Sequence, residues 1–253
     1  MDIATALGLV LGVGAIVVSF IGEGGNILAV LKWPAMLIVL GGTIGASTIT
    51  TSLRTLLTVP TFLKIAFFGK QPDPRELVQR IVKMAEKARR DGILALEDEL
   101  NTVSNPFFKK AFHLAIDGTE GNALKDALET EMSYISERHK QGIGLFQKMG
   151  GFSPTMGIIG TVLGLINTLA NTSDAGEMAV HIASAFIATL WGVGMANLVY
   201  LPLGDKLKHR HEDEMIVLEL ITQGVVSIQL GDNPRVIRTK LYSFIMPKLR
   251  ESE

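Results

Sequence analysis

The sequence has no cysteine, almost no net charge and few aromatic residues. Without cysteine the chain cannot form disulfides, thiolate metal sites or thiol nucleophiles. A formal net charge of −1 lacks the basic excess that a nucleic-acid-binding protein needs. There is also no persuasive Ser/His/Asp order, phosphate-binding loop or HExxH motif. We therefore predict no catalytic residue, no metal site, no cofactor and no nucleic-acid partner.

Apolar residues and glycine are abundant instead. Hydrophobic residues make up 47% of the chain, charged residues only 19%, and there are 26 glycines, which is unusual for a soluble domain. Four stretches contain no Asp, Glu, Lys or Arg, and each has the roughly 20 residues that a bilayer core requires. The first could be read as a signal peptide, but Asp2 precedes it and no convincing cleavage site follows. We predict four transmembrane helices: Ile3–Ile21, Trp33–Leu53, Met149–Ser173 and Met178–Gly204.

The basic residues predict the orientation of these helices, because lysine and arginine concentrate on the cytoplasmic side. The link between the first two spans has only Lys32, and the link between the last two has none. The other span ends are strongly basic. Both termini and the long middle segment are therefore predicted to be cytoplasmic. The basic residues concerned are Arg54, Lys64, Lys70, Arg138, Lys140, Lys148, Lys206, Lys208 and Arg210.

The middle segment has the signals of helices. Asp73 and Pro74 predict a helix start, Glu76 completes a capping-box spacing, and Gly92 predicts the end of that helix. A short helix is expected within Ile93–Leu100, another from Asn105-Pro106, and a long one from Leu124 towards the third span. The fold class is all-α, an integral membrane protein with a helical cytoplasmic domain. Its predicted segments are 1–53 and 148–204 in the membrane, 54–147 as the cytoplasmic domain and 205–253 as a cytoplasmic helical tail.

Glycines and prolines interrupt the apolar stretches. Gly160 and Gly164 are spaced by four, as are Gly8–Gly12 and Gly41–Gly45, and such pairs let helices approach closely. The packing could lie within one subunit or between subunits. Pro154 and Pro202 each remove a helical hydrogen bond, so each marks either a hinge or a helix boundary.

The predicted spans contain hydroxyl groups but no carboxylate. Thr161 and Thr189 could offer oxygen atoms to a passing cation, or could bond to carbonyls of their own helices. Ala188, beside Thr189, offers no polar atom. Ion paths through membranes usually need an intramembrane carboxylate. If this chain conducts ions, a partner must therefore supply that group.

Two charged groups lie outside the spans. Arg89, Arg90 and Glu97, with the neighbouring acids Asp98 and Glu99, form either a solvated face or a charged docking surface. In the stretch Lys208–Glu214, His209 and His211 are two residues apart, a helical spacing that does not converge on one metal ion.

Four motifs resemble a known family when they occur together. They are ARRDGILALE (Ala88–Glu97), ISERHKQG (Ile135–Gly142), SPTMGIIGTVLGLI (Ser153–Ile166) and GDNPRVI (Gly231–Ile237). With four spans arranged two and two, the chain resembles the A subunit of the bacterial flagellar stator. This is the MotA/PomA type within the MotA/TolQ/ExbB group, and the likeness extends over essentially the whole chain.

The resemblance implies a bacterial inner-membrane complex of five A subunits and two B subunits, in which each B helix brings the essential aspartate. Ions pass between A and B, and the cytoplasmic A domain drives the rotor protein FliG. By resemblance, Arg89, Arg90 and Glu97 contact the rotor, and Pro154 and Pro202 take part in the conformational step. Thr161 and Thr189 then line the ion route, with Ala188 beside them.

One departure bears on the ion. Sodium-type members tend to have two consecutive threonines where this chain has Ala188-Thr189. The missing hydroxyl favours protons as the transported ion, although sodium is still possible. The alternatives are an ExbB/TolQ-like energy-transducing channel subunit, which the fourth span disfavours, a solute carrier and a passive membrane scaffold.

Overall fold

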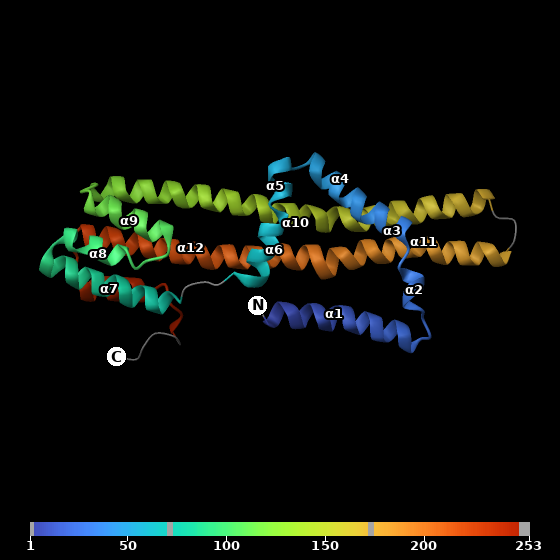
Figure 1. Cartoon of the computed structure of the whole chain (residues 1–253), viewed down its shortest axis with the longest axis horizontal. Coiled ribbons are helices and arrows are strands. Elements are labelled where there is room, and N and C mark those ends of the chain that lie inside the picture. Colours follow the sequence, from blue (N-terminus) through green and yellow to red (C-terminus); the bar gives the residue numbers. More distant parts are fainter. Residues whose placement is uncertain (1–2, 70–72, 172–174, 248–253) are drawn as a thin grey trace. The chain divides into compact units, whose positions relative to one another are not determined.

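The computed structural model describes residues 3–69, 73–171 and 175–247, and within them the regular structure is entirely helical. The chain divides into two compact units. The apolar unit comprises Met1–Gly69 and His139–His209, and the charged unit comprises Lys70–Arg138 and Arg210–Glu253. Helices α10 (Gly121–Asn171) and α12 (Leu201–Gln229) contribute residues to both units (Figure 1). The predicted all-α fold is confirmed.

Long apolar helices dominate the apolar unit. Among the described residues, three helical stretches are long and apolar enough to cross a membrane: Ala4–Gly22, Gly121–Ala170 and Ala175–Gln229. The helical stretch Trp33–Ile49 is apolar but shorter, and it ends before the predicted limit at Leu53. It ends there because Ser52 caps the next helix by accepting a hydrogen bond from the Thr55 N–H. A count of four spans therefore stays a prediction.

After the long helix α1, the first part of the apolar unit is broken into short helices, and the second part is nearly continuous. Two π-helical turns, η1 and η3, lie inside the apolar stretches. The elements are α1 (Ile3–Gly22), α2 (Ile27–Val30), α3 (Trp33–Met36), η1 (Leu37–Gly41), α4 (Gly42–Ile49), α5 (Leu53–Leu57), α6 (Val59–Phe68), the latter part of α10, α11 (Ala175–Met195), η3 (Ala196–Tyr200) and the start of α12.

The unit boundaries differ from the predicted segments. Residues 54–69, 139–147 and 205–209 lie outside the predicted spans but pack within the apolar unit, and their cytoplasmic location stays a prediction. The reason is a shared core, in which Ala66 of α6 packs in one cluster with Phe146 of α10 and Leu203 of α12. The apolar side chains of residues 59–68 therefore pack onto the long helices.

Capping residues set the helix limits in the charged unit. Asp73 accepts a hydrogen bond from the Arg75 N–H at the start of α7 (Pro74–Asp91), and Gly92 ends that helix with a φ of 86°. Asn105 caps α9 (Pro106–Ile116), as the sequence predicts, and Asn233 caps α13 (Pro234–Tyr242). The predicted short helix is a 3₁₀ turn, η2 (Ile93–Leu96), followed by α8 (Glu97–Leu100).

One buried core holds the charged unit together. Its largest members come from six α-helices and the 3₁₀ turn η2, and none is more than 2% exposed. Burial of such side chains contributes about 1.5–3 kcal/mol each. The charged groups of α7 and α8 therefore stand on a firmly packed base, built from Ile81, Phe108, Phe112, Leu128, Ile221, Ile237 and Leu241.

Candidate functional site

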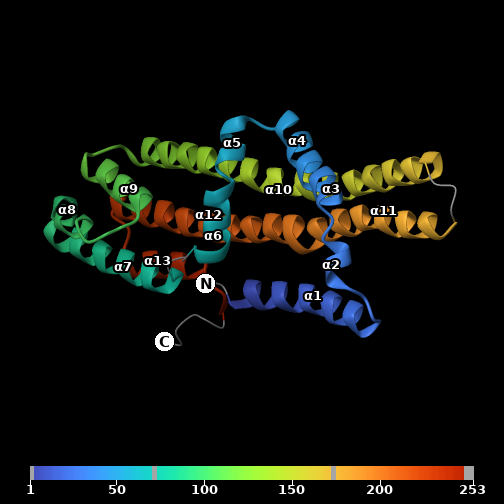
Figure 2. The same ribbon diagram turned by 45° about the vertical axis from the view of Figure 1, so that its right-hand side comes forward.

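The apolar unit contains a close helix pair, α10 and α11, which run side by side in Figure 2. A β-carbon added to Gly157 of α10 would lie 2.8 Å from the carbonyl oxygen of Ala188 and 3.2 Å from the Cα of Gly192. Added β-carbons at Gly160 and Gly164 would each lie 2.7 Å from an alanine methyl, that of Ala188 or Ala185. These glycines therefore let the two backbones approach within a single chain.

The other predicted glycine pairs behave differently. In the described chain, a β-carbon at Gly45 would meet no atom within 4 Å, whereas one at Gly42 would meet Met156 at 2.7 Å. Within one chain, therefore, Gly42 makes the close approach in this region, and the predicted pair of Gly41 and Gly45 does not. In α1, Gly12 lies against Leu198, while Gly8 borders open space.

Two threonine hydroxyls meet across this helix pair. The Oγ1 atoms of Thr161 and Thr189 are 2.6 Å apart. Thr161 also lies within hydrogen-bond distance of two carbonyl oxygens, 3.2 Å from Gly157 on its own helix and 3.1 Å from Ala185 on α11. The result is a cluster of four oxygens, and Thr161 is only 9% exposed. Thr161 therefore bonds to a carbonyl of its own helix, as one of the two alternatives predicts, and also to the second helix, while its place on an ion route stays a prediction.

The proton count of this cluster decides what it can bind. The two hydroxyl groups carry one proton each. One proton is used in the hydrogen bond between the hydroxyls, and the other is used in a hydrogen bond to a carbonyl oxygen. Lone pairs remain, so the cluster can accept a hydrogen bond from water or from a protonated acid. Ala188 is 3% exposed and its methyl group faces Gly160. That position therefore adds no oxygen.

Neither predicted proline ends a helix. Pro154 lies inside α10, and Pro202 is the second residue of α12, directly after the π-helical turn η3. Pro154 is therefore inside a helix and not at its boundary, whereas Pro202 lies within the helical stretch Ala175–Gln229 at the change from π-helical to α-helical turns. Each lacks the N–H that would bond to the carbonyl four residues earlier, so each locally weakens the helix. Beside Pro154, the buried Ser153 hydroxyl donates to the Gly192 carbonyl at 2.9 Å.

Two long-range hydrogen bonds of this region escaped the sequence analysis. Trp191 donates its indole N–H to the Val30 carbonyl at 2.8 Å, and the Lys32 ammonium donates to Ser184 at 2.8 Å. Both bonds fix the segment around α2 and α3 onto α11. The partners are more than 150 positions apart in the sequence, so no local pattern could have paired them.

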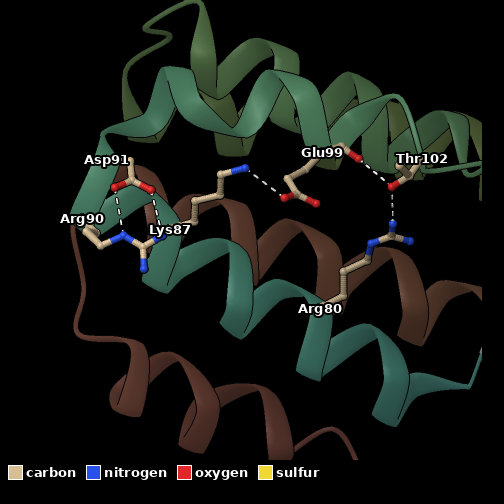
Figure 3. Close-up of polar contacts among 6 residues, drawn as sticks. All are labelled: Arg80, Lys87, Arg90, Asp91, Glu99 and Thr102. Carbon is tan, nitrogen blue, oxygen red and sulfur yellow. Dashed lines mark hydrogen bonds and ion pairs between the residues drawn. The ribbon is translucent and has the colours of Figure 1, made fainter.

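The charged hairpin of α7 and α8 exposes the predicted rotor-facing residues Arg89, Arg90 and Glu97. Figure 3 shows the polar contacts nearby, which include a hydrogen bond from the Thr102 hydroxyl to the Glu99 backbone carbonyl at 2.9 Å. Arg90 pairs with Asp91 at 2.9 Å, Lys87 of α7 pairs with Glu99 of α8 at 2.9 Å, and Arg80 donates to the Thr102 hydroxyl at 2.6 Å.

The charged neighbours of Arg89 and Glu97 form ion pairs with one another: Arg90 with Asp91, and Lys87 with Glu99. The hydrogen bond from Arg90 lowers the pKa of Asp91, and the bond from Lys87 lowers the pKa of Glu99. Both pairs therefore remain ionised at neutral pH and link neighbouring groups of this chain. Among the described residues, no group of three His, Cys, Asp or Glu side chains could hold a metal ion.

The structure defines a class of protein before any comparison: an all-helical, multi-pass membrane protein with a separate charged helical unit. The comparisons give the family. Residues 99–220 match the MotA/TolQ/ExbB proton channel family, and residues 6–92 match the motility protein A N-terminal family. The chain belongs to the MotA/TolQ/ExbB proton channel family, and the predicted resemblance is confirmed.

Related proteins are similar to this chain along almost its whole length. Motility protein A of Treponema pallidum is 34% identical, with 99% of this chain and 96% of that protein covered. Chemotaxis protein PomA of Vibrio alginolyticus is 35% identical over 97% of this chain and 96% of its own length.

Solved structures extend the likeness to the fold. The alignment with a chain of the C. jejuni MotAB structure covers 100% of this chain and 100% of that chain, with a TM-score of 0.93 and 32% identity. The flagellar MotAB stator complex of Bacillus subtilis covers 98% of this chain and 97% of its own, with a TM-score of 0.92 and 31% identity. Family, relatives and structures agree on one function, that of an ion-conducting stator subunit in the bacterial inner membrane.

Proposed function

We propose that this chain conducts protons together with a B subunit of the MotB/PomB type and turns that flow into rotation of the flagellar motor. The observation that carries the proposal is the oxygen cluster around Thr161 and Thr189, which lies where the predicted spans of α10 and α11 contain no carboxylate. Such a cluster can receive a proton or a water molecule but has no fixed charge to attract one. The partner's intramembrane aspartate would supply that charge.

The cluster suits a proton better than a sodium ion. Sodium is a hard cation that needs several oxygen ligands, whereas a proton can pass between hydroxyl, water and carboxylate groups. In this pair the carbonyls of Gly157 and Ala185 already lie against the Thr161 hydroxyl. The methyl group of Ala188 then occupies the position where a second consecutive threonine would add a ligand. We therefore assign H⁺ as the transported ion.

The close helix pair also supports a role for the prolines. Protonation of the partner's aspartate would change the charge beside α10 and α11, and a pair in backbone contact must shift as a whole. Pro154 and Pro202 weaken these helices locally. We propose that both prolines permit this movement and connect it to the charged unit.

The charged unit is proposed to drive the rotor protein FliG. Arg89 and Glu97 are both exposed, on α7 and α8, with opposite charges that a charged partner surface could match. The proposed assembly has five A and two B subunits, with both termini and the charged unit in the cytoplasm. Energy comes from the ion gradient, so no catalytic residue is required.

The test is complementation of a cell that lacks its own stator. Motility would be measured with this chain alone, with a matched B subunit, and with that B subunit carrying Asn in place of its intramembrane Asp. The proposal predicts swimming only with the intact B subunit. Assembly of the Asn-containing complex, checked by copurification, separates loss of conduction from loss of the partner. Swimming with the chain alone, or with the Asn variant, would overturn the proposal.

A further inference from the structure

One pocket of the apolar unit lies away from the threonine cluster. It has a volume of about 460 Å³ and is formed by the start of α1, the end of α6, the π-helical turn η3 and the start of α12. This volume falls in the range of about 300–1,000 Å³ that is typical of pockets for small ligands. Its walls are almost wholly apolar, and they include Gly8, Leu9, Phe67, Leu198, Pro202 and Leu203.

Among the described residues that line the pocket, one is charged. Lys206 borders the pocket on α12, and the other polar contributors are Thr5 and Asn197. The Asn197 amide donates to the Val193 carbonyl at 2.9 Å, so its N–H group serves its own helix. An apolar cavity with a lysine at its border fits a ligand that has a long hydrocarbon part and an anionic head.

The pocket exists because of glycine in α1. Gly12 brings α1 onto η3, since its added β-carbon would lie only 3.1 Å from Leu198. One turn away at Gly8, an added β-carbon would meet nothing within 4 Å. The two glycines that the sequence suggests as a packing pair therefore do different things, and Gly8 leaves the space that the pocket occupies.

We propose that this pocket binds a membrane phospholipid with an anionic headgroup, one per chain. An acyl chain lies along Gly8, Leu9 and Leu198, and Lys206 attracts the phosphate. Basic pockets between transmembrane helices on the cytoplasmic side are suited to such headgroups. The choice of leaflet depends on the proposed orientation, but binding itself does not depend on the proposed motor function.

The site has a consequence for the long helix. Pro202 and Leu198 both line the pocket, and in a regular α-helix the Leu198 carbonyl would bond to the N–H that Pro202 lacks. A bound acyl chain therefore lies directly on the weakened turn. Occupancy of the pocket should stiffen this turn, whereas an empty pocket leaves it more mobile.

Native mass spectrometry of the purified A/B complex, supplied with phosphatidylglycerol or phosphatidylethanolamine, tests the proposal. Gly8→Leu fills the pocket, and Gly14→Leu is its control, because Gly14 also borders open space but does not line the pocket. Lys206→Gln removes the charge at the border, and Lys208→Gln, an exposed position on the same helix, is its control.

The wild type and both controls should retain phosphatidylglycerol, Gly8→Leu should lose it, and Lys206→Gln should bind it about fivefold more weakly, the effect of one basic residue near a charged headgroup. Equal retention by Gly8→Leu and Gly14→Leu would overturn the site. So would dissociation of the Gly8→Leu complex into smaller assemblies, because the pocket would then hold a neighbouring copy of the chain.

Discussion

Replacement of Gly157 by alanine tests the close helix pair at its tightest point. The new β-carbon would lie 2.8 Å from the Ala188 carbonyl oxygen and 3.0 Å from the Thr189 Cα, both of them backbone atoms. Ordinary contact begins near 3.4 Å, so the helices must separate by about 0.6 Å, the difference between 3.4 and 2.8. The Thr161–Thr189 distance of 2.6 Å would then rise to about 3.2 Å.

The cost follows from overpacking, which is typically about 1–3 kcal/mol. At about 2–4 °C per kcal/mol for a chain of this size, the midpoint of thermal unfolding should fall by about 2–12 °C. Alanine stabilises a helix by up to about 1 kcal/mol relative to glycine. A control must therefore contain a glycine-to-alanine change that brings this stabilisation without a steric clash. Gly151→Ala provides it, because a β-carbon at this exposed position of the same helix meets no atom within 4 Å.

The assay compares the two variants as purified A/B complexes, and as swimming cells that express equal amounts of stator. Gly157→Ala should unfold at lower temperature than Gly151→Ala and should swim more slowly, because the hydroxyl pair is stretched. If the two variants unfold at the same temperature and swim at the same speed, the α10–α11 contact is not the close one described.

Three further predictions concern single residues. Thr161→Val keeps the shape but removes the central hydroxyl, so proton flux should fall at least about tenfold while the complex still assembles; normal flux would exclude the oxygen cluster from the route. Pro154→Ala restores a helical N–H and should slow rotation without loss of assembly, measured by tethered-cell rotation, and an unchanged speed would refute its part in the conformational step. Arg89→Glu should abolish most motility and regain it with a reversed charge on the rotor protein, whereas Lys83→Glu, an exposed change on the same helix, should be milder. Failure of every charge-swap rescue would exclude electrostatic docking at Arg89.

Local chemistry made much of the charged unit predictable from the sequence. Asp73, Gly92 and Asn105 each act on the backbone within three residues of their own position, so each fixes a helix end by itself. The long helix after residue 121 was equally predictable from its periodic apolar positions.

The limits of prediction appear where distant segments meet. The apolar character of residues 33–53 does not reveal that Ser52 begins a new helix, which shortens the preceding one. Gly8 and Gly12 look equivalent in the sequence, yet only Gly12 meets a side chain of η3. The bonds of Lys32 and Trp191 depend on how α2 and α3 lie against α11, and that arrangement is a property of the folded chain.

The oxygen cluster was predictable in part. The sequence pointed to Thr161 and Thr189 as mid-span hydroxyls, but not to the 2.6 Å contact between them or to the carbonyls of Gly157 and Ala185. Those carbonyls reach the cluster only because Gly157, Gly160 and Gly164 let the backbones approach, so the glycines and the threonines form one site.

Swimming speed measured against sodium concentration tests the central claim most directly. The cell would lack its own stator and carry this chain with a matched B subunit, at fixed membrane potential and pH. If the stator conducts protons and Ala188 stands where a second consecutive threonine would bind sodium, swimming speed should be indifferent to sodium and should be abolished by a protonophore. A speed that rises with sodium and survives the protonophore would contradict the account and would make the four-oxygen cluster a sodium site.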